Sequence, residues 1–251
     1  MPEVKLYLGD CFDVMPILAD KSVDAIITDL PYGTTACKWD TVIPFEPMWC
    51  EVKRLLKPRG AFVTTASQPF TSMLVMSNLE WFKYEWIWDK VNMFTNQMNA
   101  HKMPMRQHEN ILVFSRNGNI YNPQKRQGKP YAGRGGLNRM VEVYATLRNN
   151  GVNLTGESFP GTILQLAANH PDNHGLHPTQ KPVALYEYLI RTYTNEGDTV
   201  LDFCMGSGTT GVACVQTGRK FIGCDNVPEY VEIAKRRIAE AQAQLALPLG
   251  A

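Results

Sequence analysis

The sequence lacks the features that mark membrane, exported or strongly charged proteins. No run of apolar residues approaches the roughly 18 that a membrane-spanning helix needs, and the first ten residues show no basic stretch followed by a long apolar one. The 25 Lys and Arg nearly balance the 24 Asp and Glu, which gives a net charge of +1. We therefore expect no membrane partner and a cytoplasmic location.

Cysteine is sparse and follows no metal-binding pattern. The six cysteines stand at positions 11, 37, 50, 204, 214 and 224. None forms a C-x-x-C pair, and none has histidines at zinc-finger spacing, so no structural metal site is expected. In a chain without an export signal, these residues are expected to be reduced thiols inside the fold.

The composition is that of a globular domain. Hydrophobic residues make up 44% of the 251 residues and charged residues 20%, which is enough to build a sizeable core. This length suits one large domain, or one domain that carries an insertion.

Short apolar runs alternate with helical patterns along most of the chain. Buried strands are predicted at Val4–Gly9, Val23–Thr28, Ala61–Thr65, Tyr84–Trp88, about 109–115, Thr199–Phe203 and Lys220–Cys224. Helices are predicted at Phe45–Leu56, which ends at the stop Lys57–Gly60, at Thr209–Gln216 and at Pro228–Leu245. This alternation predicts an α/β fold, with a doubly wound, mostly parallel sheet covered by helices on both faces.

A polar and basic segment interrupts this alternation between about Asn92 and Asn173. Irregular stretches of this length inside a domain are usually functional or disordered. From His101 to Arg148 the segment holds nine Lys and Arg against two acids, a local charge of +7 that leaves −6 for the rest of the chain. Such a cluster suits a polyanion partner, although charge alone fits a solvated loop equally well.

An apolar strand runs into a glycine turn and then a helix at Val200–Thr210. Gly206 and Gly208 let a ligand approach the backbone, and the start of the helix offers free amide donors. Asp225 follows Gly206 by 19 residues, close to the spacing at which a dinucleotide-binding unit places its ribose-binding acid. The turn lacks the G-K-[ST] of a P-loop, but Gly211 completes a formal G-x-G-x-x-G. A nicotinamide-dependent oxidoreductase and a turn without a ligand therefore stay open as alternatives.

The strand Val23–Thr28 ends in Asp29-Leu30-Pro31-Tyr32. Ligands bind beyond the carboxyl ends of parallel strands, so this turn is expected to face the same crevice as the glycine turn. Asp29 and a carbonyl held beside Pro31 can accept both hydrogens of an amine on a flat ring, and Tyr32 can stack on that ring. Accepting both N–H bonds localises the nitrogen lone pair for attack on a methyl group. A plain surface turn is the alternative.

Together, Asp29-Leu30-Pro31-Tyr32 and Asp202…Gly206-Ser207-Gly208-Thr209 resemble the DNA amino-methyltransferases, which methylate adenine N6 or cytosine N4 with S-adenosylmethionine. The catalytic motif comes first, as in the β subgroup of these enzymes. The resemblance implies a Rossmann-like methyltransferase fold, a base flipped out of double-stranded DNA, and no metal, because the sulfonium methyl is already activated. Leu30 replaces the first proline of the usual D-P-P-Y, and Cys204 stands where the family usually has an aromatic residue.

The resemblance also implies roles for individual residues. Asp29, Pro31 and Tyr32 are expected to be catalytic. The cofactor is expected to contact Asp10, Cys11, Asp29, His177, Lys181, Asp202, Phe203, Gly206, Ser207, Gly208, Thr209 and Asp225. Among these, Asp10 would bind the cofactor adenine, Lys181 would lie near the cofactor carboxylate, and Asp225 would bind the ribose. DNA is expected to contact Lys102, Arg106, Lys125, Arg126, Lys129, Arg134 and Arg139.

The predicted organisation is a catalytic half at 1–91, a target-recognition insertion at 92–176 and a cofactor-binding half at 177–251. Because an aspartate heads the tetrapeptide, the resemblance favours adenine N6. Cytosine N4, a DNA-binding protein without catalysis, and methyl transfer to RNA or protein are the alternatives. The resemblance implies a bacterial or phage-infected cell, and it is compatible with a homodimer and with a cognate restriction endonuclease as partner.

Overall fold

The structure, a computed structural model, describes residues 1–35, 37, 40–91, 93–132, 152–168 and 180–246. The chain forms two compact units, one made of Met1–Asn122 with Thr162–Ala251 and a smaller one made of Pro123–Gly161. The smaller unit lies within the residues predicted as an insertion, 92–176, and the chain on either side of it contributes strands to the main sheet. Among the described residues, no helix is long and apolar enough to cross a membrane.

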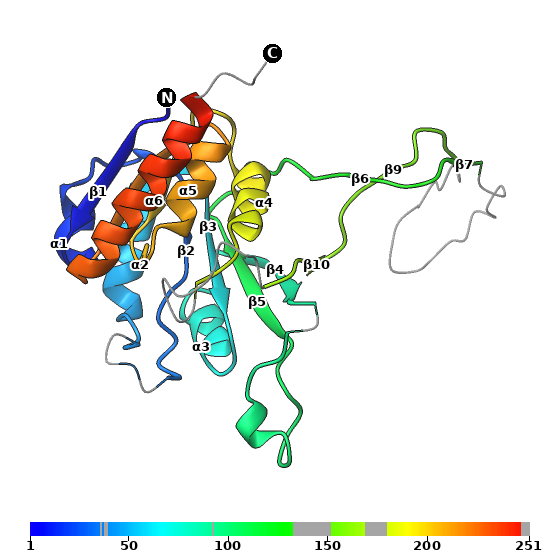
Figure 1. Cartoon of the computed structure of the whole chain (residues 1–251), viewed down its shortest axis with the longest axis horizontal. Coiled ribbons are helices and arrows are strands. Elements are labelled where there is room, and N and C mark those ends of the chain that lie inside the picture. Colours follow the sequence, from blue (N-terminus) through cyan, green and yellow to red (C-terminus); the bar gives the residue numbers. More distant parts are fainter. Residues whose placement is uncertain (36, 38–39, 92, 133–151, 169–179, 247–251) are drawn as a thin grey trace. The chain divides into compact units, whose positions relative to one another are not determined.

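An eight-stranded sheet in the order β1-β12-β11-β2-β3-β5-β4-β10 organises the larger unit (Figure 1). Its strands are β1 (Val4–Leu8), β2 (Val23–Thr28), β3 (Leu56–Ala66), β4 (Phe82–Asp89), β5 (His108–Phe114), β10 (Ile163–Gln165), β11 (Thr199–Asp202) and β12 (Lys220–Asp225). β5 runs antiparallel to both of its neighbours, and every other neighbouring pair is parallel. The predicted doubly wound, mostly parallel sheet is confirmed.

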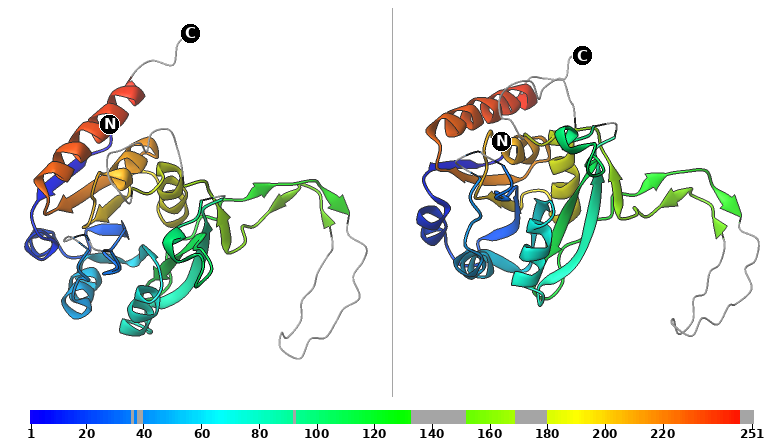
Figure 2. Two further views of the ribbon diagram at one scale, coloured as in Figure 1. Left: turned by 60° about the horizontal axis from the view of Figure 1, so that its bottom comes forward. Right: turned by 90° about the horizontal axis from the view of Figure 1, so that it is seen from below.

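Helices cover both faces of this sheet (Figure 2). One face carries α4 (Val183–Tyr193), α5 (Thr209–Gln216) and α6 (Pro228–Ala246), and the other carries α1 (Cys11–Val14), α2 (Phe45–Leu55) and α3 (Phe70–Ser77). The sheet therefore separates two apolar cores. Successive residues of β3 alternate between them, with Val63 in the first core and Phe62 in the second, as the pleat of a strand requires.

The connection between α2 and β3 differs from the prediction. The expected stop at Lys57–Gly60 is part of β3, because Leu56 already pairs with Val23 of β2. The register between the two strands then shifts before Ala61 pairs with Ala25. Such an irregularity allows a strand to contain a proline and a glycine and still pair with its neighbour in the sheet.

The smaller unit is a narrow antiparallel ladder. β6 (Arg126–Gln127) pairs with β9 (Glu157–Ser158), and β7 (Tyr131–Ala132) pairs with β8 (Val152–Asn153). An ion pair of 2.9 Å between Lys125 Nζ and Glu157 Oε2 adds to the first pair of strands. This ladder falls within the polar and basic segment that interrupts the predicted alternation of strands and helices.

Candidate active site

A cavity of about 710 Å³ lies at the carboxyl ends of β1, β2, β11 and β12. Because β2 and β11 are neighbours in the sheet, the turns that follow them meet there, and Asp29–Tyr32 and Gly206–Ser207 both line the cavity. Asp10 follows β1 and Asp225 ends β12, and both also line it. The two turns share one crevice, as the sequence predicts.

A buried carboxylate holds the two turns together. Asp202 ends β11 and accepts hydrogen bonds from Thr28 Oγ1 at the end of β2 (2.7 Å) and from Thr210 Oγ1 of α5 (2.5 Å). Burial raises the pKa of Asp202 to about 6, although these hydroxyl donors act in the opposite direction. Asp202 thus fixes the distance between the two turns, and its two oxygens are engaged by protein groups.

The glycine turn is tied to the end of β12. The amide N–H of Gly206 donates to Asp225 Oδ2 and that of Val227 donates to Asp225 Oδ1, each at 2.9 Å. Gly206 and Gly208 have φ angles of 48° and 79°, in the left-handed region that favours glycine. At its two glycines the turn therefore presents backbone without a side chain, beside a carboxylate that faces the cavity.

Arg237 of α6 supports this turn from behind. Its guanidinium Nη1 donates to the carbonyl of Ser207 at 2.7 Å, to Ser207 Oγ at 3.0 Å and to Thr209 Oγ1 at 3.2 Å. Arg237 is buried. The sequence shows α6 only as an apolar stripe, so this arginine was not predicted.

The aromatic ring of Phe203 packs in the core, although the residue also lines the cavity. Phe203 is 2% exposed and its ring stacks on that of Phe62, with centroids 6.4 Å apart, in the core between the sheet and α2. The next residue, Cys204, is half-buried at the cavity.

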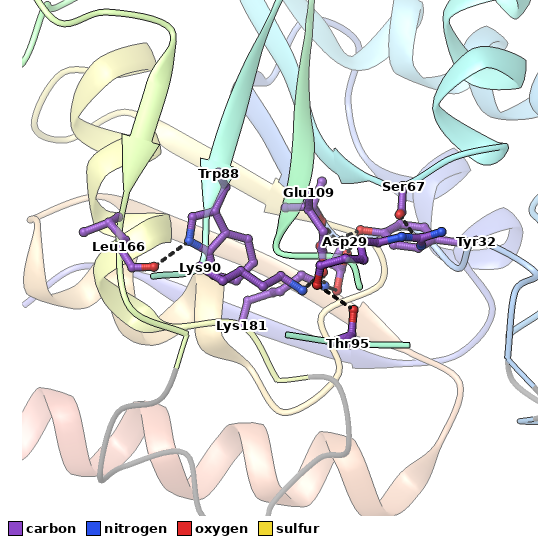
Figure 3. A network of polar contacts seen from close by, with 11 residues as sticks. Asp29, Tyr32, Ser67, Trp88, Lys90, Thr95, Glu109, Leu166 and Lys181 are labelled. Atoms are coloured by element: carbon purple, nitrogen blue, oxygen red, sulfur yellow. Dashed lines mark hydrogen bonds and ion pairs between the residues drawn. The ribbon is translucent and has the colours of Figure 1, made fainter. Parts of the chain in front are cut away.

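Asp29 lies at the centre of a polar network in this cavity (Figure 3). Its Oδ1 accepts hydrogen bonds from Tyr32 Oη at 2.9 Å and from Thr65 Oγ1. Its Oδ2 accepts one from Lys181 Nζ at 2.6 Å. Both oxygens of the Asp29 carboxylate are therefore held by hydrogen bonds, and the Asp29 side chain is 24% exposed.

Glu109 of β5 joins this network to a second lysine. Its Oε1 accepts from Lys90 Nζ at 2.5 Å, and its Oε2 lies 3.5 Å from Lys181 Nζ and 3.4 Å from Tyr32 Oη. Burial opposes ionisation of Glu109, but the two ammonium groups outweigh it and hold the pKa of this carboxyl below its usual value. Two carboxylates and two ammonium groups thus form a nearly neutral cluster.

Lys181 is the link between the two carboxylates. Burial acts to lower its pKa, but Asp29 and Glu109 together raise the pKa of this ammonium above its usual value. Its Nζ also lies 5.6 Å from the centre of the Tyr32 ring, and Tyr32 stacks on Phe70 of α3 with centroids 5.2 Å apart. Lys181 is therefore a charged donor held at a fixed place in the cavity.

Comparison with known proteins decides the family. The family model described as DNA methylase matches residues 23–236. The chain belongs to this family. It is 30% identical over 249 residues to the type II methyltransferase M.HpaI of Haemophilus parainfluenzae, covering 93% of this chain and 74% of that protein.

Two solved structures extend the comparison. The crystal structure of an M1.HpyAVI–SAM complex is 25% identical, with a TM-score of 0.63, and the match covers 94% of this chain and 98% of that one. The cytosine-N4-specific PvuII DNA methyltransferase shares the fold, with a TM-score of 0.68 at 18% identity over 97% of this chain and 92% of that one. Membership in the DNA methylase family favours methyl transfer over the oxidoreductase and the non-catalytic alternatives, and it leaves the choice of base open.

The cavity of the methylase gathers most of the residues predicted for the cofactor. Lining it are Asp10, Cys11, Asp29, Lys181, Asp202, Phe203, Gly206, Ser207, Thr209 and Asp225. Gly208 follows in the same turn as the residue before α5. His177 lies outside the described residues.

The residues predicted for DNA are divided between the two units. Lys102 and Arg106 lie in the connection between β4 and β5, and Arg106 lines the cavity, where its Nη1 donates to Ser67 Oγ at 2.6 Å. Lys125, Arg126 and Lys129 belong to the smaller unit. Arg134 and Arg139 lie outside the described residues.

Three further residues of the network were not predicted as site residues: Thr65, Lys90 and Glu109. Thr65 ends one predicted strand, Lys90 follows another by two residues, and Glu109 begins a third. A charged residue just after an apolar strand was the available signal for Lys90. Glu109 lies near the start of the antiparallel strand β5, so it could be placed only once that direction was known.

Proposed function

We propose that this methylase transfers a methyl group from S-adenosylmethionine to N6 of adenine in double-stranded DNA. One observation carries the proposal: two turns meet at a single cavity, where Asp29 offers an acceptor for an amine and the glycine turn with Asp225 offers a cradle for a nucleoside. Because its relative M.HpaI is named a type II methyltransferase, we also propose a type II modification role.

The residues beside β1 and β12 fit the cofactor. Asp10 and Asp225 place two carboxylates at the cavity, and these accept hydrogen bonds from the amino and hydroxyl groups of a nucleoside. The backbone of Gly206 and Gly208 permits close approach to the ligand. We assign the ribose hydroxyls to Asp225 and the adenine moiety to Asp10. When bound, the cofactor supplies a methyl group on a positively charged sulfur, which is a good leaving group.

Asp29 binds and orients the target amine. A carboxylate offers about four acceptor positions, and Tyr32, Thr65 and Lys181 use three of them. The fourth accepts one amine N–H, and the carbonyl beside Pro31 accepts the other. The localised lone pair of the nitrogen forms the bond to the methyl carbon, while the carbon–sulfur bond breaks and its electron pair stays on sulfur. The surplus proton on the nitrogen passes to Asp29 or to water.

Basic residues of both units suit the handling of DNA. A base inside a duplex cannot reach Asp29, so the target must be rotated out of the stack, at a cost of a few kcal/mol. We propose that Lys102 and Arg106 grip phosphates beside the cavity, and that Lys125, Arg126 and Lys129 of the smaller unit do so elsewhere on the duplex. DNA affinity is then expected to fall steeply with salt concentration.

The proposal is tested by identifying the methylated nucleoside. Duplex DNA and a matched RNA duplex are incubated with the protein and labelled S-adenosylmethionine, then digested and separated by liquid chromatography with mass detection. N6-methyladenine from DNA alone is the expected product. N4-methylcytosine would overturn the choice of base, and labelled RNA would overturn the choice of substrate. Long-read sequencing of DNA from expressing cells then defines the recognition sequence.

A further inference from the structure

Three cations line the cavity within the described residues, and only one of them contacts Asp29. Lys90 is held by Glu109 at 2.5 Å, with its Nζ 5.3 Å from the centre of the Trp88 ring. Arg106 is held by Ser67 at 2.6 Å. Lys181 is the cation at the catalytic carboxylate, with 2.6 Å between its Nζ and Asp29 Oδ2 (Figure 3).

Asp29 and Lys181 therefore present a hydrogen-bond acceptor and a donor side by side. Adenine carries the complementary pair on its Watson–Crick edge, where the N6 amine donates and the adjacent ring nitrogen N1 accepts. Both nitrogens are bonded to the same ring carbon, so two protein groups 2.6 Å apart can engage them together. An ammonium has three N–H groups, and among the described residues Asp29 and Glu109 engage two of them.

We propose that Lys181 is a specificity-determining residue that donates a hydrogen bond to N1 of the flipped adenine while Asp29 accepts from N6. This inference rests on the proposed function and adds a contact to it. Cytosine presents the same order as adenine, with its N4 amine beside the acceptor N3, so this pair of groups selects bases that carry an amine next to an acceptor nitrogen. Guanine and thymine present the opposite order on this edge, a carbonyl acceptor followed by an N–H donor. Each would place its carbonyl against the Asp29 carboxylate and its N–H against the Lys181 ammonium, which leaves buried polar groups unpaired.

The same contact bears on which nitrogen receives the methyl group. In free adenine the ring nitrogen holds an in-plane lone pair, whereas that of the amine is delocalised into the ring. A donor fixed on N1 occupies the competing lone pair, and so directs methyl transfer to N6.

Glu109 and Asp29 keep the donor in place for this role. Their carboxylates lie 3.5 Å and 2.6 Å from Lys181 Nζ, and together they keep the ammonium protonated in a site where it is 9% exposed. The Lys181 ammonium loses little conformational freedom when the base binds, which favours discrimination between bases with similar Watson–Crick edges.

The test replaces single ring nitrogens of the target base. Duplexes carry adenine, 1-deazaadenine, in which a C–H replaces N1, or 7-deazaadenine, which alters the opposite edge. In every duplex an abasic site stands opposite the target base, so that losing the Watson–Crick bond at N1 does not change the cost of flipping. Affinity is measured by fluorescence anisotropy in the presence of S-adenosylhomocysteine, and the position of the methyl group is determined by mass spectrometry. The variants are Lys181→Met, Lys181→Gln and, as a matched control from the same network, Lys90→Met.

Wild-type protein is expected to bind the 1-deazaadenine duplex about tenfold or more weakly than the adenine duplex, and to bind the 7-deazaadenine duplex as tightly as adenine. Lys181→Met is expected to lose this discrimination and to release some 1-methyladenine, Lys181→Gln, which keeps an N–H donor, is expected to retain part of it, and Lys90→Met is expected to retain it fully. Should wild type bind adenine and 1-deazaadenine equally, or should Lys181→Met still discriminate while losing only cofactor affinity, the inference fails. The nucleoside methylated in the unmodified duplex tests the proposed function separately.

Discussion

Replacing Glu109 with glutamine tests whether the cavity depends on a balanced set of charges. The substitution keeps the shape of the side chain but removes one of the two negative charges of the cluster, so Lys90 loses its charged partner at 2.5 Å and Lys181 loses one at 3.5 Å. The side chains of Lys90 and Glu109 are only 7% and 12% exposed. Water can therefore replace little of the lost interaction.

Removing one partner of a buried ion pair costs about 3–5 kcal/mol, and we take the lower figure because glutamine still accepts one hydrogen bond. A loss of about 3 kcal/mol corresponds to a Tm lowered by roughly 6–12 °C for a domain of this size. The measurement is chemical and thermal unfolding of both proteins at pH 7. Glu232→Gln, which breaks an exposed pair with Lys235 on α6, is the matched control and is expected to cost less than about 1 kcal/mol.

The pH dependence of stability provides a second, independent test of the same substitution. Because the pKa of Glu109 is lowered in the folded protein, its contribution to stability is present above the unfolded value of 4.5 and is lost as the pH falls through the folded value. The difference in free energy of unfolding between wild type and Glu109→Gln is expected to become smaller below pH 4.5. A cost no larger than that of the Glu232 control, or a difference that is constant with pH, would refute the charge argument.

Three further substitutions separate catalysis, cofactor binding and the backbone of the turn. Asp29→Ala is expected to lower methyl transfer by about 10²–10⁴-fold, while calorimetric titration shows unchanged cofactor affinity; near-normal transfer would remove Asp29 from the mechanism. Asp225→Ala is expected to weaken cofactor binding by about tenfold or more, and unchanged affinity would count against the ribose assignment. Gly208→Ala is expected to cost well over 1–2 kcal/mol of stability, about the strain of a left-handed residue alone, because the new Cβ meets Ala234 Cβ at 2.7 Å. Gly197→Ala is the control, because φ is +82° there and no atom lies within 4 Å of the new Cβ, so only the backbone strain remains. Equal losses of unfolding free energy in Gly208→Ala and Gly197→Ala would contradict the packing argument.

The sequence predicted the parts of the site that depend on single strands and the turns after them. The helix Thr209–Gln216 has the same bounds in the prediction and in the structure. The glycine turn marks where it begins, and the end of its apolar run marks where it stops. Asp29 and Gly206 could be placed at one edge of the sheet because each follows a parallel strand, and parallel strands end on the same side.

The parts that depend on pairing between distant strands could not be predicted. Lys90 and Glu109 meet because β4 and β5 are antiparallel and pair Trp88 with Glu109, and hydrophobic periodicity contains no information on strand direction or register.

The sheet order has a consequence for synthesis on the ribosome. β1 is the first strand to emerge, yet it pairs with β12, and β2 lies between β3 and the late strand β11. An apolar strand at the start of the chain must therefore wait until more than 200 further residues have been made. The cavity cannot form before β12 and α6 emerge. A truncated translation product therefore retains the Asp29 turn but lacks Asp225, which lines the cavity, and Arg237, which supports the glycine turn.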